Sequence, residues 1–217
     1  MARRLIGLAA IAAALMAAAP AGAAGSASRP CRLPPAATVH AASSFATLYS
    51  VRKDERTIVR ACLRRDGTRL ELRDTGDELD SIEVADVTLA GRYAGWTEIW
   101  RTRYGDSRAT ASVFDLKKRR VRWGTVVAYR PAGEAPKVTD FALGKAGRAA
   151  LVTQEHRIDY PNPDGTPSEA RTVWAVDAGP SPRKLGEGLD IDLTSLSVSG
   201  FTATWTAGGQ PRSAQLY

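Results

Sequence analysis

The sequence contains 217 residues, of which 44% are hydrophobic and 24% are charged, and it carries a formal net charge of +7. A chain of this length can form one domain with a sizeable hydrophobic core. Because 23 acidic residues are spread among the 30 basic ones, the charge favours solubility and a loose attraction to anionic surfaces, and by itself it does not predict nucleic-acid binding.

The first 23 residues have the pattern of an export signal. Arg3 and Arg4 precede an apolar run, Leu5–Ala19, and the small residues Ala21–Ala23 fit an A-x-A cleavage site. The run is shorter than the roughly 20 apolar residues that span a membrane, and we expect no transmembrane segment after cleavage. The sequence therefore predicts a signal peptide over residues 1–23 and a mature protein that is secreted or held in the periplasm or cell envelope.

The chain has two cysteines, Cys31 and Cys62, and both lie after the predicted signal. An even number of cysteines in an exported chain indicates a disulfide, because free thiols are a liability in an oxidising compartment. We expect a Cys31–Cys62 bridge, with two unrelated thiols as the alternative. The sequence has no C-x-x-C pattern, so it does not indicate redox catalysis or a structural zinc site.

Short runs with period-two alternation of apolar and polar residues dominate the chain after the signal, whereas helical spacing is almost absent. Turn-forming residues separate these runs, among them Asp66-Gly67, Gly105-Asp106, Ala132–Glu134, Asn162–Gly165, Gly179-Pro180 and Gly208-Gly209. This pattern predicts an all-β fold. The predicted strands include Thr57–Leu63, Arg69–Leu72, Arg108–Leu116, Arg171–Val176 and Phe201–Trp205.

One motif recurs along the chain: two apolar residues at alternate positions, followed by a glycine, an alanine and a tryptophan at fixed spacing. It spans Val87–Trp96 and Leu196–Trp205, it is degraded at Val39–Leu48, and a copy that starts at Phe141 fits with one inserted residue. The copies start roughly 50 residues apart, close to the length of one propeller blade. We expect the glycine to allow positive φ, the alanine to fit a crowded inner face, and the tryptophan or leucine to fill the space between sheets.

Each of the first three copies is followed by a second pair of predicted strands, in TIVRACLRRDGTRLEL, ATASVFDLKKRRVRW and ARTVWAVDAGPSPRKL, whereas only RSAQLY remains after the fourth. A unit of four strands with its last strand missing is typical of a closing blade that a strand from the other end completes. The residues of interest are the motif starts, Gly91, Gly200, Trp96, Trp205, and the strand endings Val113–Leu116 and Val173–Asp177.

On these residues the chain resembles secreted proteins with β-propeller repeats of the TolB-like or WD40-like kind. Such proteins have more blades than the roughly four for which this chain has room. The resemblance therefore implies a small or partial β-propeller of about four antiparallel blades, either closed or an open arc, with a β-sandwich as the alternative. It also implies residues 24–35 as an N-terminal segment, residues 36–217 as a single β-repeat domain, and a role in scaffolding interactions.

Catalytic and metal-binding motifs are not found in the sequence. His40 and His156 are the only histidines, and we expect His156 to be a hydrogen-bonded residue at a loop edge rather than a base. The stretch Asp159–Gly165 resembles a calcium loop, but Tyr160 stands where the first acid belongs, so an ordinary hairpin loop is the stronger interpretation. No catalytic residue, cofactor or metal site is predicted.

The basic run Lys117–Arg122, next to Trp123, invites a nucleic-acid or anionic-polymer interpretation. Its position between two predicted strands favours a solvated turn, and we expect nucleic acid not to be the partner. The tryptophans are expected to fill the core or the space between sheets, except for Trp100, which is out of phase with the motif and is the one expected to be exposed.

These features favour an exported, non-catalytic binding or interaction module that uses the loops at one end of its units on an unknown protein or glycan. The first alternative is an extracellular hydrolase acting on a polymer, with an acid pair drawn from Glu98, Asp106, Asp159 and Glu169. A carboxylate pair repeated at strand ends would favour it, and none is found. A structural repeat protein without a ligand is the second alternative.

Overall fold

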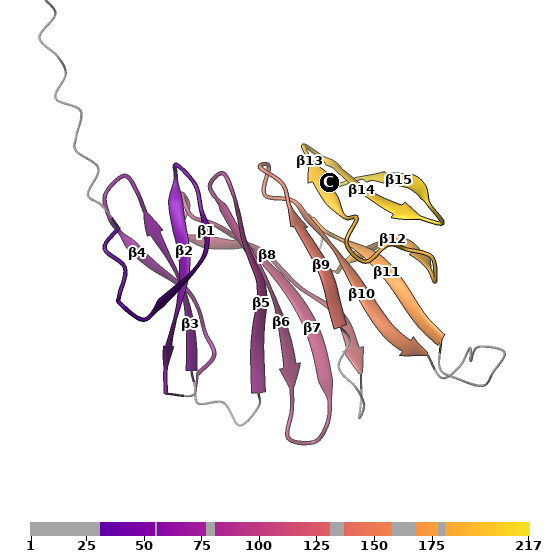
Figure 1. Ribbon diagram of the computed structural model, residues 1–217, viewed down its shortest axis with the longest axis horizontal. Coiled ribbons are helices and arrows are strands. Elements are labelled where there is room, and N and C mark those ends of the chain that lie inside the picture. Colours follow the sequence, from indigo (N-terminus) through magenta and orange to yellow (C-terminus); the bar gives the residue numbers. More distant parts are fainter. Residues whose placement is uncertain (1–30, 55, 77–80, 131–136, 158–167, 178–180) are drawn as a thin grey trace, which may run out of the picture.

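The computed structural model describes residues 31–54, 56–76, 81–130, 137–157, 168–177 and 181–217. Within these ranges the regular secondary structure consists of strands, which form four antiparallel sheets, so the predicted all-β class is confirmed (Figure 1).

The first sheet contains β1 (Ala37–Ala42), β2 (Ala46–Lys53), β3 (Arg56–Leu63) and β4 (Arg69–Asp74). The second contains β5 (Ser81–Ala90), β6 (Tyr93–Arg101), β7 (Ser107–Asp115) and β8 (Arg120–Arg130). The third contains β9 (Lys137–Leu143), β10 (Ala149–Arg157), β11 (Ser168–Val176) and β12 (Arg183–Gly188), and the fourth β13 (Ser197–Ser199), β14 (Thr202–Ala207) and β15 (Gln210–Gln215).

In every sheet each strand pairs with the strand that precedes or follows it in the chain. The sheets therefore coincide with the units expected from the sequence, and each of the five predicted strands falls on one observed strand, give or take one terminal residue. The fourth sheet has three strands within the described residues, and none of them comes from the N-terminal part of the chain. The short fourth unit is thus confirmed, and completion by a distant strand is not observed in the described residues.

The recurring motif forms the hairpin between the first two strands of each sheet. In the second and fourth sheets the turn glycines, Gly91 and Gly200, have φ values of 61° and 58°, a conformation in which a side chain is strained. The alanine that follows is the second residue of the next strand, and neither Ala94 nor Ala203 has exposed surface. The conformational role predicted for the motif is therefore confirmed.

Three hydrophobic clusters hold the sheets together, one at each contact between consecutive sheets. Leu48 and Ala61 of the first sheet pack with Ala94 and Leu116 of the second. The cluster between the second and third sheets contains Tyr93, Ala109, Ala111, Val113, Val127, Ala149, Leu151 and Val176. The cluster between the third and fourth contains Ala150, Val152, Val173, Ala175, Ile191, Leu196, Ala203, Trp205 and Leu216. Because alternate residues of β10 enter different clusters, the third sheet is buried on both faces.

The sheets follow one another in a row from the N-terminal to the C-terminal side, and the first and fourth sheets lie at opposite ends of it (Figure 1). The first strands of consecutive sheets are in contact, β1 with β5, β5 with β9, and β9 with β13. A closed ring is not formed by the described part of the chain. This stacking is compatible with an open, propeller-like arc and also with the alternative of sheets packed face to face.

The predicted disulfide is present, because Cys31 and Cys62 are bonded with their Cα atoms 5.9 Å apart. It fastens the segment before β1 to the buried end of β3, where Cys62 is 1% exposed. A cross-link that closes a loop of about 30 residues stabilises the fold by roughly 3 to 4 kcal/mol in the chain-entropy view. Residues 1–30, which contain the predicted signal, lie outside the described residues.

Two turn glycines with similar backbone conformations offer a matched test of the packing between sheets. Gly147 has φ +72°, and a Cβ there would lie 2.6 Å from the ring of Tyr93, whereas Gly91 has φ +61° with nothing within 4 Å. Tyr93 is 5% exposed and has little room to move. We predict that Gly147→Ala lowers the free energy of unfolding by about 3 kcal/mol, and Gly91→Ala by about 1 kcal/mol. Urea unfolding of both variants measures the difference, and equal losses would contradict the close approach.

Candidate functional site

A hollow lies where turns of three sheets meet, and we call it the basic pocket. It has a volume of about 640 Å³. The side chains come from the start of β6, the β7–β8 turn, the start of β8, and the β9–β10 and β13–β14 turns. The pocket is lined by Arg92, Tyr93, Asp115, Lys118, Arg120, Val121, Arg122, Trp123, Ala146, Arg148 and Phe201.

Asp115, at the end of β7, is the one acidic residue among those that line the basic pocket, and it is already engaged. Its Oδ1 accepts the backbone N–H groups of Lys117 and Lys118, at 3.0 and 3.1 Å, which fixes the β7–β8 turn. Its Oδ2 lies 3.2 Å from Nη2 of Arg92, and the Asp115 side chain is 3% exposed. The carboxylate is therefore used to shape the turn and to hold Arg92, and it neutralises little of the remaining positive charge.

The Tyr93 hydroxyl joins two of the arginines. It accepts hydrogen bonds from Nη2 of Arg92 at 2.7 Å and from Nη1 of Arg122 at 2.6 Å. Both guanidinium groups also lie over the tyrosine ring, 4.9 and 5.1 Å from its centre. Since the hydroxyl oxygen accepts two N–H groups, its own hydrogen remains to donate.

Two further contacts attach this part of the second sheet to the third. Arg122 Nη1 also donates to the carbonyl oxygen of Ala146 at 2.9 Å, and Trp123 Nε1 donates to that of Gly147 at 3.0 Å. The β9–β10 turn thereby carries Arg148 into the pocket. Its guanidinium group lies 4.9 Å from the ring centre of Phe201, and its Nε and Nη1 atoms are buried with no hydrogen-bond partner among the described residues.

The structure divides the basic run predicted from the sequence into two parts. Lys117 to Arg120 are exposed, so the expectation of a solvated turn is confirmed for them. Arg122 and Trp123 are half-buried and contact the neighbouring sheet. Sequence reasoning missed Arg92, Arg148 and Phe201, because they come from other units and no pattern in the sequence joins them to the run.

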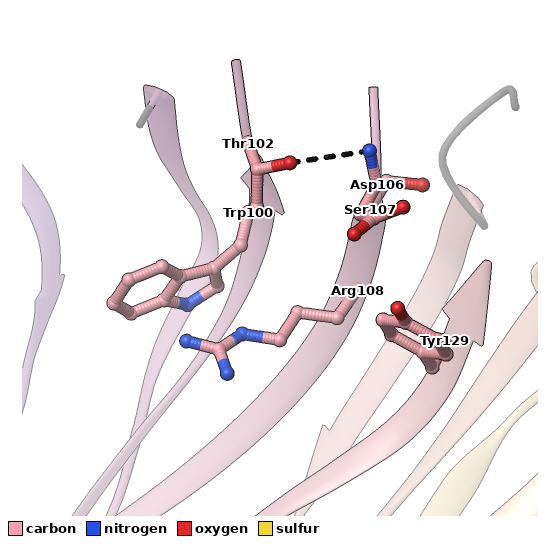
Figure 2. Close-up of a pocket in the computed structure, with 6 residues that line it drawn as sticks. All are labelled: Trp100, Thr102, Asp106, Ser107, Arg108 and Tyr129. Carbon is pink, nitrogen blue, oxygen red and sulfur yellow. Dashed lines mark hydrogen bonds between the residues drawn. The ribbon is translucent and has the colours of Figure 1, made fainter. Parts of the chain in front are cut away.

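A second, smaller pocket lies at the opposite end of β6, β7 and β8, and we call it the Trp100 pocket. Figure 2 shows the residues that line it, Trp100, Thr102, Asp106, Ser107, Arg108 and Tyr129. Its volume is about 150 Å³. Trp100 is half-buried, with the guanidinium groups of Arg73 and Arg108 over its ring at 5.0 and 4.2 Å from the centre, so it is less exposed than expected.

Glu98, named above as a candidate acid, is 5% exposed and lies in a packing network. Its Oε1 accepts a hydrogen bond from Trp96 Nε1 at 2.7 Å, and its Oε2 accepts one from Trp100 Nε1 at 2.9 Å. Nε of Arg73, from the last strand of the first sheet, is 3.0 Å from Oε1. The carboxylate therefore connects two sheets, and both of its oxygens are occupied.

The other candidate residues are distributed over separate elements. His40 Nε2 is 2.8 Å from the Ser50 hydroxyl, a contact between neighbouring strands. Glu169 accepts a hydrogen bond from Gln154 within the third sheet. His156 pairs through its backbone with Glu169, and nothing is described of its side chain. Asp159 and the whole stretch Asp159–Gly165 lie outside the described residues. In the described part of the chain, no cluster of three or more His, Cys, Asp or Glu side chains could hold a metal ion.

Asp140 of β9 has an unusual carboxyl group. Its Oδ2 accepts the backbone N–H of Leu196 at 3.0 Å, which links the third and fourth sheets. Burial raises the pKa of Asp140 above its ordinary value, and the nearby charges of Asp86 and Asp192 act in the same direction, although the Leu196 hydrogen bond favours the ionised form. Keeping the Asp140 side chain ionised therefore costs free energy in this environment.

The chain was compared with known proteins, and no family model, curated protein or solved structure matches it. Among the residues described, there is also no helix long and apolar enough to cross a membrane.

The Glu98 network predicts a large and specific loss of stability. In Glu98→Gln an amide N–H₂ would face an indole N–H, and the Arg73 guanidinium would lose its carboxylate partner. We predict that the free energy of unfolding falls by about 3 kcal/mol. The matched control is Glu83→Gln, because Glu83 pairs with Arg101 at 3.4 Å on the exposed surface and should unfold like the wild type. Urea unfolding compares the two variants. A Glu98→Gln variant with the free energy of unfolding of the wild type would contradict the network.

The pKa of Asp140 predicts a dependence on pH. Since the raised pKa means that the folded protein binds this proton more tightly than the unfolded chain, protonation stabilises the fold. Relative to Asp140→Asn, which keeps an acceptor for Leu196, the wild type should gain stability as the pH falls from neutrality towards 3.8, the ordinary pKa of an aspartate. Urea midpoints across this range measure the effect. A wild type that instead loses stability relative to the variant would show that the pKa is lowered.

Proposed function

We propose that this chain is an exported, non-catalytic binding module, a small propeller-like scaffold whose partner carries negative charge and docks in the basic pocket. The observation that carries the proposal is the convergence of turns from three sheets around one pocket with an excess of cations. The resemblance to TolB-like and WD40-like repeats supports the same arrangement, in which loops at one end of the units meet the partner.

The charge balance of the pocket favours an anionic partner. Arg92 is paired with Asp115, whereas Lys118, Arg120, Arg122 and Arg148 have no carboxylate within ion-pair distance in the described part of the chain. Gathering unpaired cations at one place costs free energy through their mutual repulsion. A bound anion would offset this repulsion and would bring hydrogen-bond acceptors to the free N–H groups.

The aromatic rings of the basic pocket hold the arginines in place before a partner arrives. Arg122 lies over Tyr93 and also over Trp123, 5.2 Å from that ring centre, and Arg148 lies over Phe201. Guanidinium groups that are already ordered lose less conformational entropy on binding, so a larger share of their electrostatic attraction becomes affinity. Nucleic acid is a weaker candidate, because the rings that would stack on bases are already covered by guanidinium groups.

Export is supported by the signal pattern over residues 1–23 and by the Cys31–Cys62 disulfide, since such bridges persist mainly in oxidising compartments. The hydrolase alternative gains no observation in its favour. Of its four candidate acids, Glu98 is occupied by two indoles and an arginine, Glu169 lies in a different sheet, and Asp159 is outside the described residues.

Binding of a soluble polyanion tests the proposal. The probe is dextran sulfate, with neutral dextran as the uncharged comparison, and the dissociation constant is measured by calorimetry in low-salt buffer. The double variant Lys118→Gln/Arg120→Gln removes two exposed cations of the pocket, so its stability should be unchanged. We expect the affinity for dextran sulfate to fall about tenfold and the wild-type affinity to weaken with added salt.

The matched control is Arg52→Gln/Lys53→Gln, which removes two exposed cations at the end of β2 and changes the net charge equally. It should keep nearly the wild-type affinity. Equal losses in the two double variants would show that binding reflects net charge alone, and equal binding of neutral dextran would show that the anionic groups are not recognised; either result overturns the proposal.

A further inference from the structure

The Trp100 pocket is separate from the basic pocket, since it lies at the other end of the same strands. Trp100, Arg108 and Tyr129 stand opposite one another on β6, β7 and β8, where Trp100 pairs with Arg108 and Arg108 pairs with Tyr129. Their side chains therefore share one face of the second sheet. Figure 2 shows Arg108 reaching towards the Trp100 ring, with the Tyr129 ring on the far side and the hydroxyl-bearing residues above.

One hydroxyl in this pocket has a defined hydrogen-bonding direction. Thr102 Oγ1 accepts the backbone N–H groups of Tyr104 and Asp106, at 3.3 and 3.2 Å, and the latter bond is drawn in Figure 2. Because the oxygen already accepts two hydrogen bonds, its own hydrogen is the group that remains for a ligand. Arg108 adds further N–H donors. The pocket thus combines a donor at Thr102 with a cation held by stacking.

The opposite wall is aromatic. Tyr129 is 59% exposed and presents its ring to the pocket, while Trp100 supports Arg108 from the other side. A volume of about 150 Å³ corresponds to about five water molecules at liquid density, which is enough for a single six-membered ring with its substituents. The space is too small for a peptide segment with several side chains.

We propose that the Trp100 pocket binds one pyranose ring of a glycan. A pyranose has an apolar C–H face, which suits the Tyr129 ring, and a rim of hydroxyls that both donate and accept, which suits Thr102 and Arg108. A flat aromatic ligand would cover Tyr129 but would bring few acceptors to the Thr102 hydroxyl and the Arg108 N–H groups. This site does not depend on the proposed anion site, and it gives the module a second point of contact.

Saturation-transfer NMR on the intact protein tests this site. The probes are the methyl pyranosides of glucose, galactose, mannose, N-acetylglucosamine and glucuronic acid, each at millimolar concentration, because a single sugar ring binds weakly. At least one is expected to show saturation transfer with a millimolar dissociation constant. Tyr129→Ala should abolish the signal.

Tyr104→Ala is the matched control, since Tyr104 is 74% exposed, stacks with Arg103, and does not line the pocket; it should bind as the wild type does. Dextran sulfate affinity should be the same in Tyr129→Ala and wild type, so failure of one site is distinguishable from failure of the other. If none of the five pyranosides shows saturation transfer, or if Tyr129→Ala binds as well as Tyr104→Ala, the glycan site is overturned.

Discussion

The packing of small side chains where one sheet meets the next is the constraint on which the rest of this structure depends. Alanines occupy each of the three contacts between sheets, and Ala94, Ala149 and Ala203 have no exposed surface. Larger residues at these positions would separate the sheets and open voids, because protein interiors are close-packed. The close approach brings the turns of neighbouring sheets within reach of one another, so both the fold and the basic pocket follow from it.

The repeated units were predictable from the sequence because their determinants are local. The turn at Gly91 needs a residue that tolerates positive φ, and the alternation in Arg108–Leu116 follows from a strand that is buried on one face at each second position. Each of these signals is contained within a few consecutive residues. The disulfide was also predictable, since the chain contains two cysteines. Ring closure was not predictable, because it depends on the angle between sheets, which no local pattern encodes.

The two pockets could not be derived from the sequence for different reasons. Arg92, Arg148 and Phe201 belong to three different units, and only the packing of those units brings them together. In the Trp100 pocket the difficulty is register. The pairing of β7 with β8 shifts at two irregularities, and counting back from the turn without them would pair Arg108 with Val127 instead of Tyr129. Bulges of this kind re-aim side chains, and short sequence patterns do not reveal them.

The two ends of the second sheet use arginine in opposite ways. At the Trp100 end, Arg73 is held by Glu98 and both it and Arg108 lie over an indole ring, so cationic side chains help to build the walls of a mostly apolar pocket. At the turn end, Asp115 is the one carboxylate that lines the pocket. It accepts a backbone hydrogen bond within the β7–β8 turn and pairs with Arg92, so the other lining cations have no carboxylate partner among the lining residues. Because the strands between these ends are packed against sheets on both sides, each pocket is attached to a rigid element, which limits the entropy lost on binding. One sheet can therefore carry two sites of different chemistry without either disturbing the other.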